Sequence, residues 1–242
     1  MDPSKPETFD ALIAENIEEV PGVYTLRLKA ADGRKFNFNA GQFAMLCFKD
    51  EPDPKLRCRA YSVSSSQNQH DYIDLTIKRY HEWTTRATSL PVGSVVELKF
   101  PFGKFCLDDP QDEIVFIAGG VGVTPFMGMI RYLAETKSTR KARLLYSCRT
   151  SWTIIFKKEL DLIAQDWSNL KLVFTISDED HQDSGWTGLR GFIDKTFLQN
   201  EIGDCSGKVF YVCGPNGMIR AVDEALTGLG VARDKIRTEN FG

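Results

Sequence analysis

Hydrophobic and polar positions mostly alternate in the first hundred residues. The alternation is clearest at residues 23–30 (VYTLRLKA), 42–48 (QFAMLCF), 72–79 (YIDLTIKR) and 94–100 (SVVELKF), with glycines between these stretches. A period of two places apolar side chains on one face of a strand, and glycine supplies the turns that join short strands. This half of the chain is therefore predicted to form an antiparallel sandwich or a small barrel.

The pattern changes after the polar stretch at residues 107–112 (LDDPQD). Continuous apolar runs follow it at residues 114–118 (IVFIA), 143–148 (RLLYSC), 170–176 (LKLVFTI) and 208–213 (KVFYVC). Segments with helical periodicity lie between these runs. Strands that are apolar throughout and alternate with helices are typical of a doubly wound parallel sheet, whose strands are buried on both faces.

The composition allows two domains and excludes several classes of protein. The chain has 242 residues, 42% of them hydrophobic, with 16 Phe and 4 Trp, which is enough for two cores of about 100 to 150 residues each. We predict a β-barrel domain over residues 1–109 and an α/β domain over residues 110–242. The net charge of -3 gives no overall field that attracts nucleic acid, and nucleic-acid binding is not expected.

The sequence also predicts the cellular compartment and the state of the cysteines. The N-terminal stretch MDPSKPETFD lacks the apolar segment of a secretory signal, and the uncharged stretch 114–130 is glycine-rich and shorter than the ~20 apolar residues of a membrane span. We expect a cytoplasmic protein without a membrane span. The six cysteines are irregularly spaced and are expected to stay reduced. The absence of a CxxC motif and of paired histidines predicts no metal site.

A glycine-rich turn follows the first continuous apolar run. Residues 119–125 (GGVGVTP) lead from that strand into a predicted helix that runs to about Glu135. Glycine permits a sharp turn and close approach to a phosphate, while Thr124 can cap the helix and Pro125 suits its first position. The free N–H groups at a helix start favour an anion such as a nucleotide pyrophosphate. A tight turn without a ligand is the alternative.

The standard dehydrogenase fingerprint is incomplete in this turn. Pro125 stands where G-x-G-x-x-G has its third glycine. Residues 148–150 (CRT) stand where a ribose-binding carboxylate usually follows the second strand. The turn by itself therefore does not predict a standard dehydrogenase.

A second turn, at residues 213–218 (CGPNGM), also follows an apolar run and precedes a predicted helix. In parallel sheets the ligand crevice lies at the carboxyl ends of the strands, so both turns can face one ligand. Cys213 at that edge can pack beside a flat ring and influence its redox chemistry. The alternative is that Cys213 is simply a small buried strand residue.

The barrel half contains the tetrapeptide Arg59-Ala60-Tyr61-Ser62. An arginine suits a phosphate, a tyrosine ring can lie on another aromatic face, and a serine hydroxyl can bond a ring nitrogen. Together these residues describe a seat for a flavin nucleotide. The alternative is a strand with one exposed arginine and one packed tyrosine.

Taken in order, RAYS at 59–62, GGVGVTPF at 119–126, CGPNGM at 213–218 and the terminal ENFG at 239–242 resemble the ferredoxin-NADP reductase superfamily of flavoprotein reductases. The resemblance covers essentially the whole chain and is strongest to reductase components of bacterial oxygenases, which often end in a similar Glu-x-Phe-Gly. It implies a six-stranded antiparallel β-barrel that holds FAD, or FMN. It also implies a Rossmann-like parallel-sheet domain that binds NADH or NADPH.

The resemblance implies roles for residues of the barrel half. Arg59 would contact the flavin phosphate, Tyr61 would stack on the isoalloxazine ring, and Ser62 would bond its N5 region. Residues 83–86 (WTTR) match a family segment that lends amides to the pyrophosphate. Thr84 and Thr85 are the candidates there, with ordinary loop threonines as the alternative.

It implies roles for the second half as well. Gly120, Gly122 and Thr124 would cradle the nicotinamide nucleotide, with Cys213 near the nicotinamide. Phe241 would cover the flavin face opposite the tyrosine, or else is a packed terminal side chain.

Glu239 has two interpretations: it helps with proton handling, or it is an ordinary surface residue. The candidate catalytic residues are Ser62, Cys213 and Glu239. The remaining candidates for cofactor contacts are Ala60, Thr76, Lys78, Val123, Arg149, Gly214, Pro215 and Met218.

The implied reaction is hydride transfer from nicotinamide C4 to flavin N5, followed by release of single electrons to an acceptor. Because these 242 residues hold no four-cysteine iron-sulfur segment, we expect a separate acceptor such as a ferredoxin, a flavodoxin, an oxygenase component or a small molecule. Arg149 is a candidate contact for the 2′-phosphate of NADPH. The acidic run at residues 177–180 (SDED) would repel that phosphate and favours NADH.

Two other functions stay open at this point. One is a reductase that uses free flavin as its substrate. The other is a non-catalytic flavin-binding subunit that relays electrons or regulates a partner.

Overall fold

The structure is a computed structural model that describes residues 5–107, 113–177 and 185–240. By their contacts, the residues form two compact units. The first contains Met1–Leu107 together with Thr124–Glu135, and the second contains Asp108–Val123 together with Thr136–Gly242.

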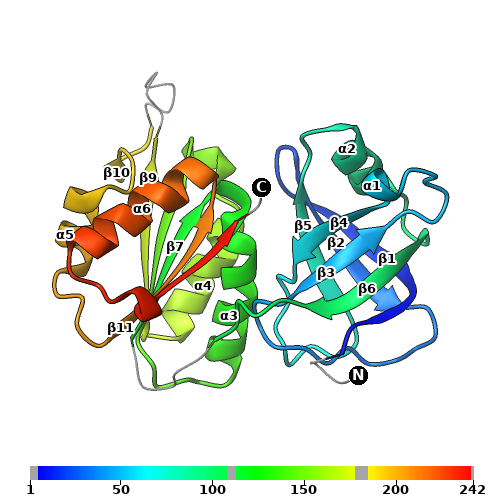
Figure 1. Cartoon of the computed structure of the whole chain (residues 1–242), viewed down its shortest axis with the longest axis horizontal. Helices are drawn as coiled ribbons and strands as arrows, with labels where there is room; N and C mark the ends of the chain where they lie inside the picture. Colours follow the sequence, from blue (N-terminus) through cyan, green and yellow to red (C-terminus); the bar gives the residue numbers. More distant parts are fainter. Residues whose placement is uncertain (1–4, 108–112, 178–184, 241–242) are drawn as a thin grey trace. The chain divides into compact units, whose positions relative to one another are not determined.

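The first unit is built on a six-stranded antiparallel sheet with the order β4-β3-β6-β1-β2-β5 (Figure 1). Its strands are β1 (Glu7–Val20), β2 (Val23–Ala30), β3 (Phe43–Cys47), β4 (Cys58–Ser62), β5 (Ile73–Lys78) and β6 (Val95–Phe102). A bridge between Val63 and Leu75 joins the chain after β4 to β5, the two ends of the sheet. The sheet therefore closes into the predicted six-stranded barrel.

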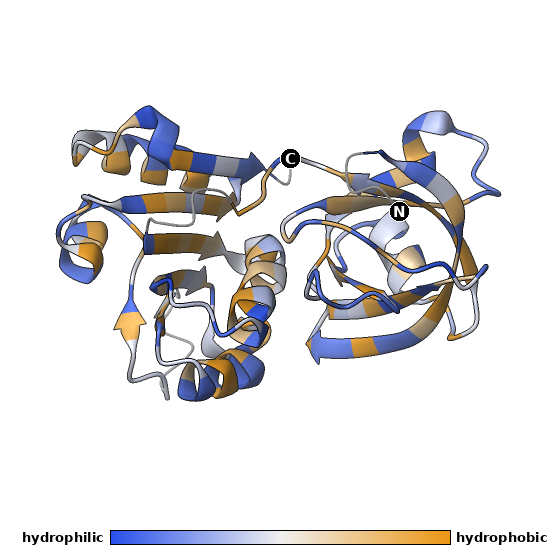
Figure 2. Cartoon of the chain, turned by 90° about the horizontal axis from the view of Figure 1, so that it is seen from below, coloured by the Kyte–Doolittle hydropathy of each residue, from blue (hydrophilic) through white to orange (hydrophobic). Residues whose placement is uncertain are grey.

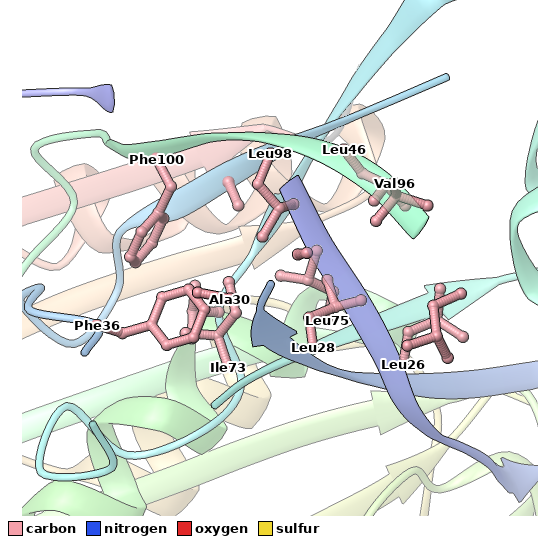
Figure 3. Close-up of a cluster of buried hydrophobic side chains, with 14 of the residues drawn as sticks. Leu26, Leu28, Ala30, Phe36, Leu46, Ile73, Leu75, Val96, Leu98 and Phe100 are labelled. Carbon is pink, nitrogen blue, oxygen red and sulfur yellow. The ribbon is translucent and has the colours of Figure 1, made fainter. Parts of the chain in front are cut away.

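Apolar side chains from alternate strand positions fill the barrel. Leu26, Leu28, Leu75, Leu98 and Phe100 are fully buried and point into one cluster (Figure 3). Figure 2 shows the same alternation as orange and blue bands along the barrel strands. Burying one such side chain stabilises the fold by about 1.5–3 kcal/mol relative to leaving it exposed, so this cluster provides the main cohesion of the barrel.

Three helices accompany the barrel: α1 (Pro54–Arg57), α2 (Glu82–Thr88) and α3 (Thr124–Glu135). α3 is anchored to the segment that follows β4. The Arg131 guanidinium donates a hydrogen bond of 2.6 Å to the carbonyl oxygen of Ser64. The Ser66 hydroxyl donates one of 2.5 Å to the Glu135 carboxylate. The helix that begins after the glycine turn thus belongs by its contacts to the barrel unit.

A disulfide bond joins Cys47 at the end of β3 to Cys58 at the start of β4. The expectation that all six cysteines stay reduced is therefore wrong for this pair. The two residues lie opposite each other in the antiparallel ladder, with Cα atoms 4.2 Å apart. Eleven positions separate them in sequence, so the linear spacing does not reveal that they meet.

The second unit contains a six-stranded parallel sheet with the order β10-β9-β8-β7-β11-β12 (Figure 1). Its strands are β7 (Glu113–Gly119), β8 (Ala142–Cys148), β9 (Leu170–Ile176), β10 (Leu189–Arg190), β11 (Lys208–Gly214) and β12 (Ile236–Asn240). Its helical elements are η1 (Gly120–Val123), η2 (Ser151–Thr153), α4 (Lys157–Asp166), α5 (Lys195–Ile202), α6 (Asn216–Gly228) and η3 (Arg233–Lys235).

The central strands of this sheet are apolar because helices cover them. Leu198 of α5 and Val222 and Leu226 of α6 are buried in one cluster with Val115 of β7 and Val212 of β11. In Figure 2 the helices of this unit show hydrophobic and hydrophilic residues in alternation, as expected for helices with one face against a sheet. The predicted doubly wound parallel sheet is confirmed.

The uncharged stretch 114–130 forms a strand, a short 3₁₀ turn and a helix, as the sequence predicts. No helix within the described part of the chain is long and apolar enough to cross a membrane.

Candidate functional site

In the barrel unit, β4 presents Arg59 beside the aromatic side chain of Trp83. One guanidinium nitrogen of Arg59 donates hydrogen bonds to the carbonyl oxygens of Lys55, at 2.8 Å, and Cys58, at 2.9 Å. The guanidinium carbon lies 5.8 Å from the centroid of the Trp83 ring. Backbone carbonyls and an aromatic face thus hold the arginine head while part of the side chain stays exposed.

Tyr61 lies two positions further along β4 and stacks on the same indole. The two ring centroids are 5.8 Å apart and the planes are inclined by 26°. Trp83 packs against Phe48, with centroids 4.8 Å apart, and its indole N–H donates a 2.7 Å hydrogen bond to the Leu56 carbonyl. Burial raises the pKa of the Tyr61 phenol above its ordinary value, which keeps the ring neutral. The result is an aromatic platform with a cation at its edge.

The other candidates of β4 and β5 differ in exposure. Ala60 is exposed, whereas Ser62 is buried. Thr76 is buried, and its hydroxyl is hydrogen-bonded to the hydroxyls of Thr25, at 2.8 Å, and Ser64, at 2.9 Å. The barrel interior thus already engages the Thr76 hydroxyl. Lys78, at the end of β5, is exposed.

The predicted pyrophosphate segment forms α2. The Thr84 hydroxyl donates to the carbonyl oxygen of His81 and accepts hydrogen bonds from the N–H groups of Tyr80 and His81, at 2.8–2.9 Å. Thr85 is exposed. Thr84 therefore shapes the turn that begins the helix, and the structure brings this segment beside Arg59 and Tyr61 through Trp83.

In the second unit, the two strand-ending turns pack backbone against backbone. A methyl group placed on Gly122 would lie 2.3 Å from the carbonyl oxygen of Cys213, so no larger residue fits there without movement. Gly120 differs: its φ of +54° is left-handed, and nothing lies within 4 Å of the position that a side chain would take. Packing thus requires glycine at one position, while the other offers an open backbone surface to a ligand.

Cys213 is the second-to-last residue of β11 and pairs with Glu239 of β12 in the parallel register. The thiol is fully buried. Burial, and then the nearby Glu239 carboxylate, raise the pKa of the Cys213 thiol well above its ordinary value. The thiol therefore keeps its proton at neutral pH and is a poor nucleophile, because the thiolate is the reactive form.

The remaining candidates surround these turns. Val123 and Thr124 are buried where η1 leads into α3, and Gly214 is buried at the end of β11. Pro215 is exposed just before α6, and Met218, in its first turn, is half-buried.

Three sequence-based expectations concern the remaining part of the nucleotide site and the flavin. Arg149 follows β8 and is exposed. Phe241 and the acidic residues 178–180 lie outside the described residues. The role of Phe241 as a cover over the flavin face and the preference for NADH over NADPH therefore stay predictions.

Two residues that organise these sites are not evident from the sequence. Trp83 stands out there only as the first residue of the segment 83–86, yet in the structure it contacts Tyr61, Arg59 and Phe48. Tyr146 on β8 belongs to no motif, yet its hydroxyl donates a 2.9 Å hydrogen bond to the carbonyl of Gly120. An aromatic residue in a short helix and one in a buried strand carry no local signal of such contacts. Among the described residues, no cluster of three or more His, Cys, Asp or Glu side chains is arranged to hold a metal ion.

A barrel with a cationic aromatic platform and a parallel sheet with an open glycine turn both suit the binding of a nucleotide. The oxidoreductase FAD-binding domain family matches residues 13–106, and the oxidoreductase NAD-binding domain family matches residues 116–224. The chain therefore contains an oxidoreductase FAD-binding domain and an oxidoreductase NAD-binding domain, the two domains that the resemblance to the ferredoxin-NADP reductase superfamily implies.

Curated relatives are about 30% identical to the chain over the aligned residues. The glycine betaine monooxygenase reductase subunit of Chromohalobacter salexigens is 30% identical over 93% of the chain. The NADH oxidoreductase HCR of Escherichia coli is 29% identical over 89% of it. The chain spans only 62% and 63% of the lengths of these two relatives.

Solved structures share the fold at lower sequence identity. The flavohem-like FAD/NAD-binding domain of nitric oxide dioxygenase from Vibrio cholerae matches with a TM-score of 0.85 and 24% identity, covering 97% of the chain and 98% of that domain. The cytochrome b5 reductase domain of Ulva prolifera nitrate reductase matches with a TM-score of 0.85 and 23% identity, covering 99% of both chains.

Proposed function

We propose that this protein is an NAD(P)H-dependent flavoprotein reductase that binds FAD in its barrel unit and passes electrons to a separate acceptor. The observation that carries the proposal is the platform formed by Arg59, Tyr61 and Trp83 inside the segment that matches the FAD-binding family. A guanidinium suits a phosphate and an aromatic face suits a flat ring. The residues present therefore fit a flavin nucleotide.

The second unit supplies the features that a nicotinamide nucleotide needs. Gly120 leaves its backbone open at the carboxyl end of β7, where ligands bind in parallel sheets. Cys213 contributes a neutral thiol at the neighbouring strand end. A neutral, buried thiol can bound the pocket of an uncharged ring without reacting with it.

When bound, FAD would supply the redox chemistry, namely the capacity to take a hydride from a reduced nicotinamide and to give up single electrons. The protein's own residues bind and orient. Arg59 holds the phosphate, Tyr61 orients the ring, Ser62 offers a hydrogen bond to it, and the glycine turn positions the second nucleotide. Glu239, opposite Cys213, is the candidate for proton handling.

The acceptor that we propose is a separate protein, such as an oxygenase component, a ferredoxin or a flavodoxin. Support comes from the relatives, since several are named as reductase subunits of oxygenase or demethylase systems. Pull-down with the tagged chain from its own cell extract, with and without dithionite, would identify it. Recovery of an oxygenase component or a ferredoxin supports this assignment, and turnover with free flavin as the only efficient acceptor would replace it.

The test of the central proposal is spectroscopic. We expect the purified protein, supplied with FAD, to absorb as a bound flavin and to bleach anaerobically on addition of NADH or NADPH. Parallel titrations with FMN and with each nicotinamide nucleotide determine which cofactors the chain prefers. A protein that takes up neither FAD nor FMN would refute the proposal, and flavin that neither nucleotide reduces would favour a non-catalytic electron relay.

A further inference from the structure

A buried hydroxyl group connects two segments at the carboxyl edge of the parallel sheet. Tyr146 lies near the end of β8 and is fully buried. Its hydroxyl donates a 2.9 Å hydrogen bond to the carbonyl of Gly120 in η1. The same oxygen accepts a 3.3 Å hydrogen bond from the N–H of Ile155. Both bonds leave the strand and end in the segments that follow β7 and β8.

A phenol is not needed to fill this position. Phe174 on the neighbouring strand packs against Tyr146 with ring centroids 6.2 Å apart, and Phe116 on the other neighbouring strand is fully buried without a hydroxyl. Burying a hydroxyl costs free energy unless it is hydrogen-bonded. The Tyr146 hydroxyl is therefore explained by its hydrogen-bond partners, of which the Gly120 carbonyl and the Ile155 N–H lie in the segments that follow β7 and β8.

The two segments carry groups suited to a dinucleotide. η1 contains the open, left-handed backbone of Gly120. The segment after β8 begins with the exposed side chains of Arg149 and Trp152, the latter 51% accessible. β7 and β8 are adjacent parallel strands, so both segments emerge at the same sheet edge. The backbone of η1 can approach a pyrophosphate, and the segment after β8 can contact a nucleoside.

The segment after β8 is held in a fixed shape behind these exposed groups. Ile154 and Ile155 are buried, and Phe156 has a left-handed φ of 60°. A non-glycine residue in that conformation is uncommon and persists only where its surroundings enforce it. The hydrogen bond from Ile155 to Tyr146 is one of those constraints.

We infer that Tyr146 is a positioning residue that couples the glycine turn to the segment after β8, so that both segments bind one nicotinamide dinucleotide as a unit. The inference rests on the proposed function, because it assigns a role within that nucleotide site. It concerns the ADP-ribose part of the ligand, so it can be tested without flavin reduction. Tyr146 does not touch the reacting atoms in this scheme.

The test compares Tyr146→Phe with Tyr211→Phe. Both changes remove one hydroxyl from a fully buried tyrosine in the same sheet, but Tyr211 lies on β11, two positions before Cys213. The probe is ADP-ribose, with its Kd measured by isothermal titration calorimetry. We expect Y146F to weaken ADP-ribose about tenfold, the factor for loss of a hydrogen bond of about 1.4 kcal/mol. We expect Tyr211→Phe to change the Kd less than twofold.

A general structural defect would also lower FAD affinity, so FAD binding to both variants is the second readout. FAD affinity within twofold of wild type in Y146F, together with the loss for ADP-ribose, supports coupling. In steady-state assays, coupling raises KM for the nicotinamide nucleotide and leaves kcat within about twofold. An unchanged ADP-ribose Kd in folded Y146F overturns the inference. Failure of the wild-type chain to bind ADP-ribose overturns the proposed function instead.

Deuterium exchange on the wild-type chain covers the case in which Y146F does not fold. Addition of ADP-ribose is expected to slow exchange in peptides that contain residues 120–123 and residues 150–156 to similar extents. Protection confined to one of the two segments would contradict coupling through Tyr146.

Discussion

The ring of Tyr61 lies on the indole of Trp83, with centroids 5.8 Å apart and planes inclined by 26°. The two residues come from β4 and α2 and are 22 positions apart in the chain. Trp83 thus sets the tilt of the tyrosine that we propose to orient the flavin. A stacked aromatic pair of this kind contributes about 0.5–1.5 kcal/mol beyond its buried area.

Removal of the indole is therefore expected to lower flavin affinity. Trp83→Ala should weaken FAD binding about three- to tenfold, because Tyr61 loses the ring that holds it. Trp83→Phe should recover much of the loss. Quenching of flavin fluorescence measures both values. Equal FAD affinity in Trp83→Ala and the wild type would show that Tyr61 needs no support from Trp83.

Arg59 is expected to contribute more to FAD binding than an ordinary surface arginine does. Arg59→Ala should weaken FAD about tenfold or more, since hydrogen bonds to charged groups contribute about 1.5–3 kcal/mol. Arg34→Ala is the control, because this arginine lies at the surface in ion pairs with Glu7 and Asp32, and such pairs contribute about 0–1 kcal/mol. Unchanged flavin content in Arg59→Ala would show that the arginine is misassigned.

The two glycines of the turn are expected to respond differently to alanine. Gly122→Ala places a methyl group 2.3 Å from a backbone oxygen, so it should destabilise the second unit. Gly120→Ala meets no atom but must hold φ at +54°, a strain of about 1–2 kcal/mol. We expect Gly120→Ala to fold, to keep FAD and to bind NADH more weakly. A larger loss of thermal stability in Gly120→Ala than in Gly122→Ala would contradict this division.

The buried thiol of Cys213 is expected to make stability depend on alkaline pH. Its pKa is raised in the folded state, while an unfolded thiol ionises near pH 8.5, so the unfolded state binds fewer protons above that pH. The stabilising contribution is complete below about pH 8.5 and declines as pH rises further. Between pH 7.5 and 9.5 the loss should reach about 1.4 kcal/mol.

Urea unfolding of the wild type and of Cys213→Ala at the two pH values measures this contribution. The alanine variant should lose less stability on going to pH 9.5. Identical pH dependence in both proteins would mean that the thiol ionises equally well in the folded and unfolded states.

In rapid mixing with NADH, we also expect the Cys213→Ala variant to keep its bound flavin and to reduce that flavin more slowly than the wild type does.

The Cys47–Cys58 bond closes the loop that leads into Arg59. A disulfide that closes a loop of about 12 residues stabilises the folded state by about 3 kcal/mol, because it limits the conformations of the unfolded chain. Reduction with dithiothreitol should therefore lower the urea midpoint, and the double variant Cys47→Ser with Cys58→Ser should no longer respond to the reductant. Cys205→Ser is the control, since Cys205 is a free cysteine. Alkylation of Cys47 and Cys58 in the denatured, unreduced protein would exclude the bond.

Much of the fold follows from local patterns. The alternation at residues 23–30 and 72–79 predicts β2 and β5, and the apolar runs predict β7, β8, β9 and β11 within a residue or two. The pattern does not predict β1, because shifts in strand register between Ile13 and Glu15 and between Glu18 and Val20 break its period of two. The short β10 has two residues, too few for any period.

The candidate sites divide in the same way. The sequence by itself determined the residue types and their order: an arginine and a tyrosine on one strand, and glycines at two strand ends. Turns and strand faces are local features, since they depend on residues that are adjacent in the sequence. Contacts across the chain are not, and only the tertiary structure placed Trp83 under Tyr61, Cys47 against Cys58 and the Tyr146 hydroxyl on Gly120. These pairs meet because the barrel closes and parallel strands align, which depends on the packing of the whole unit.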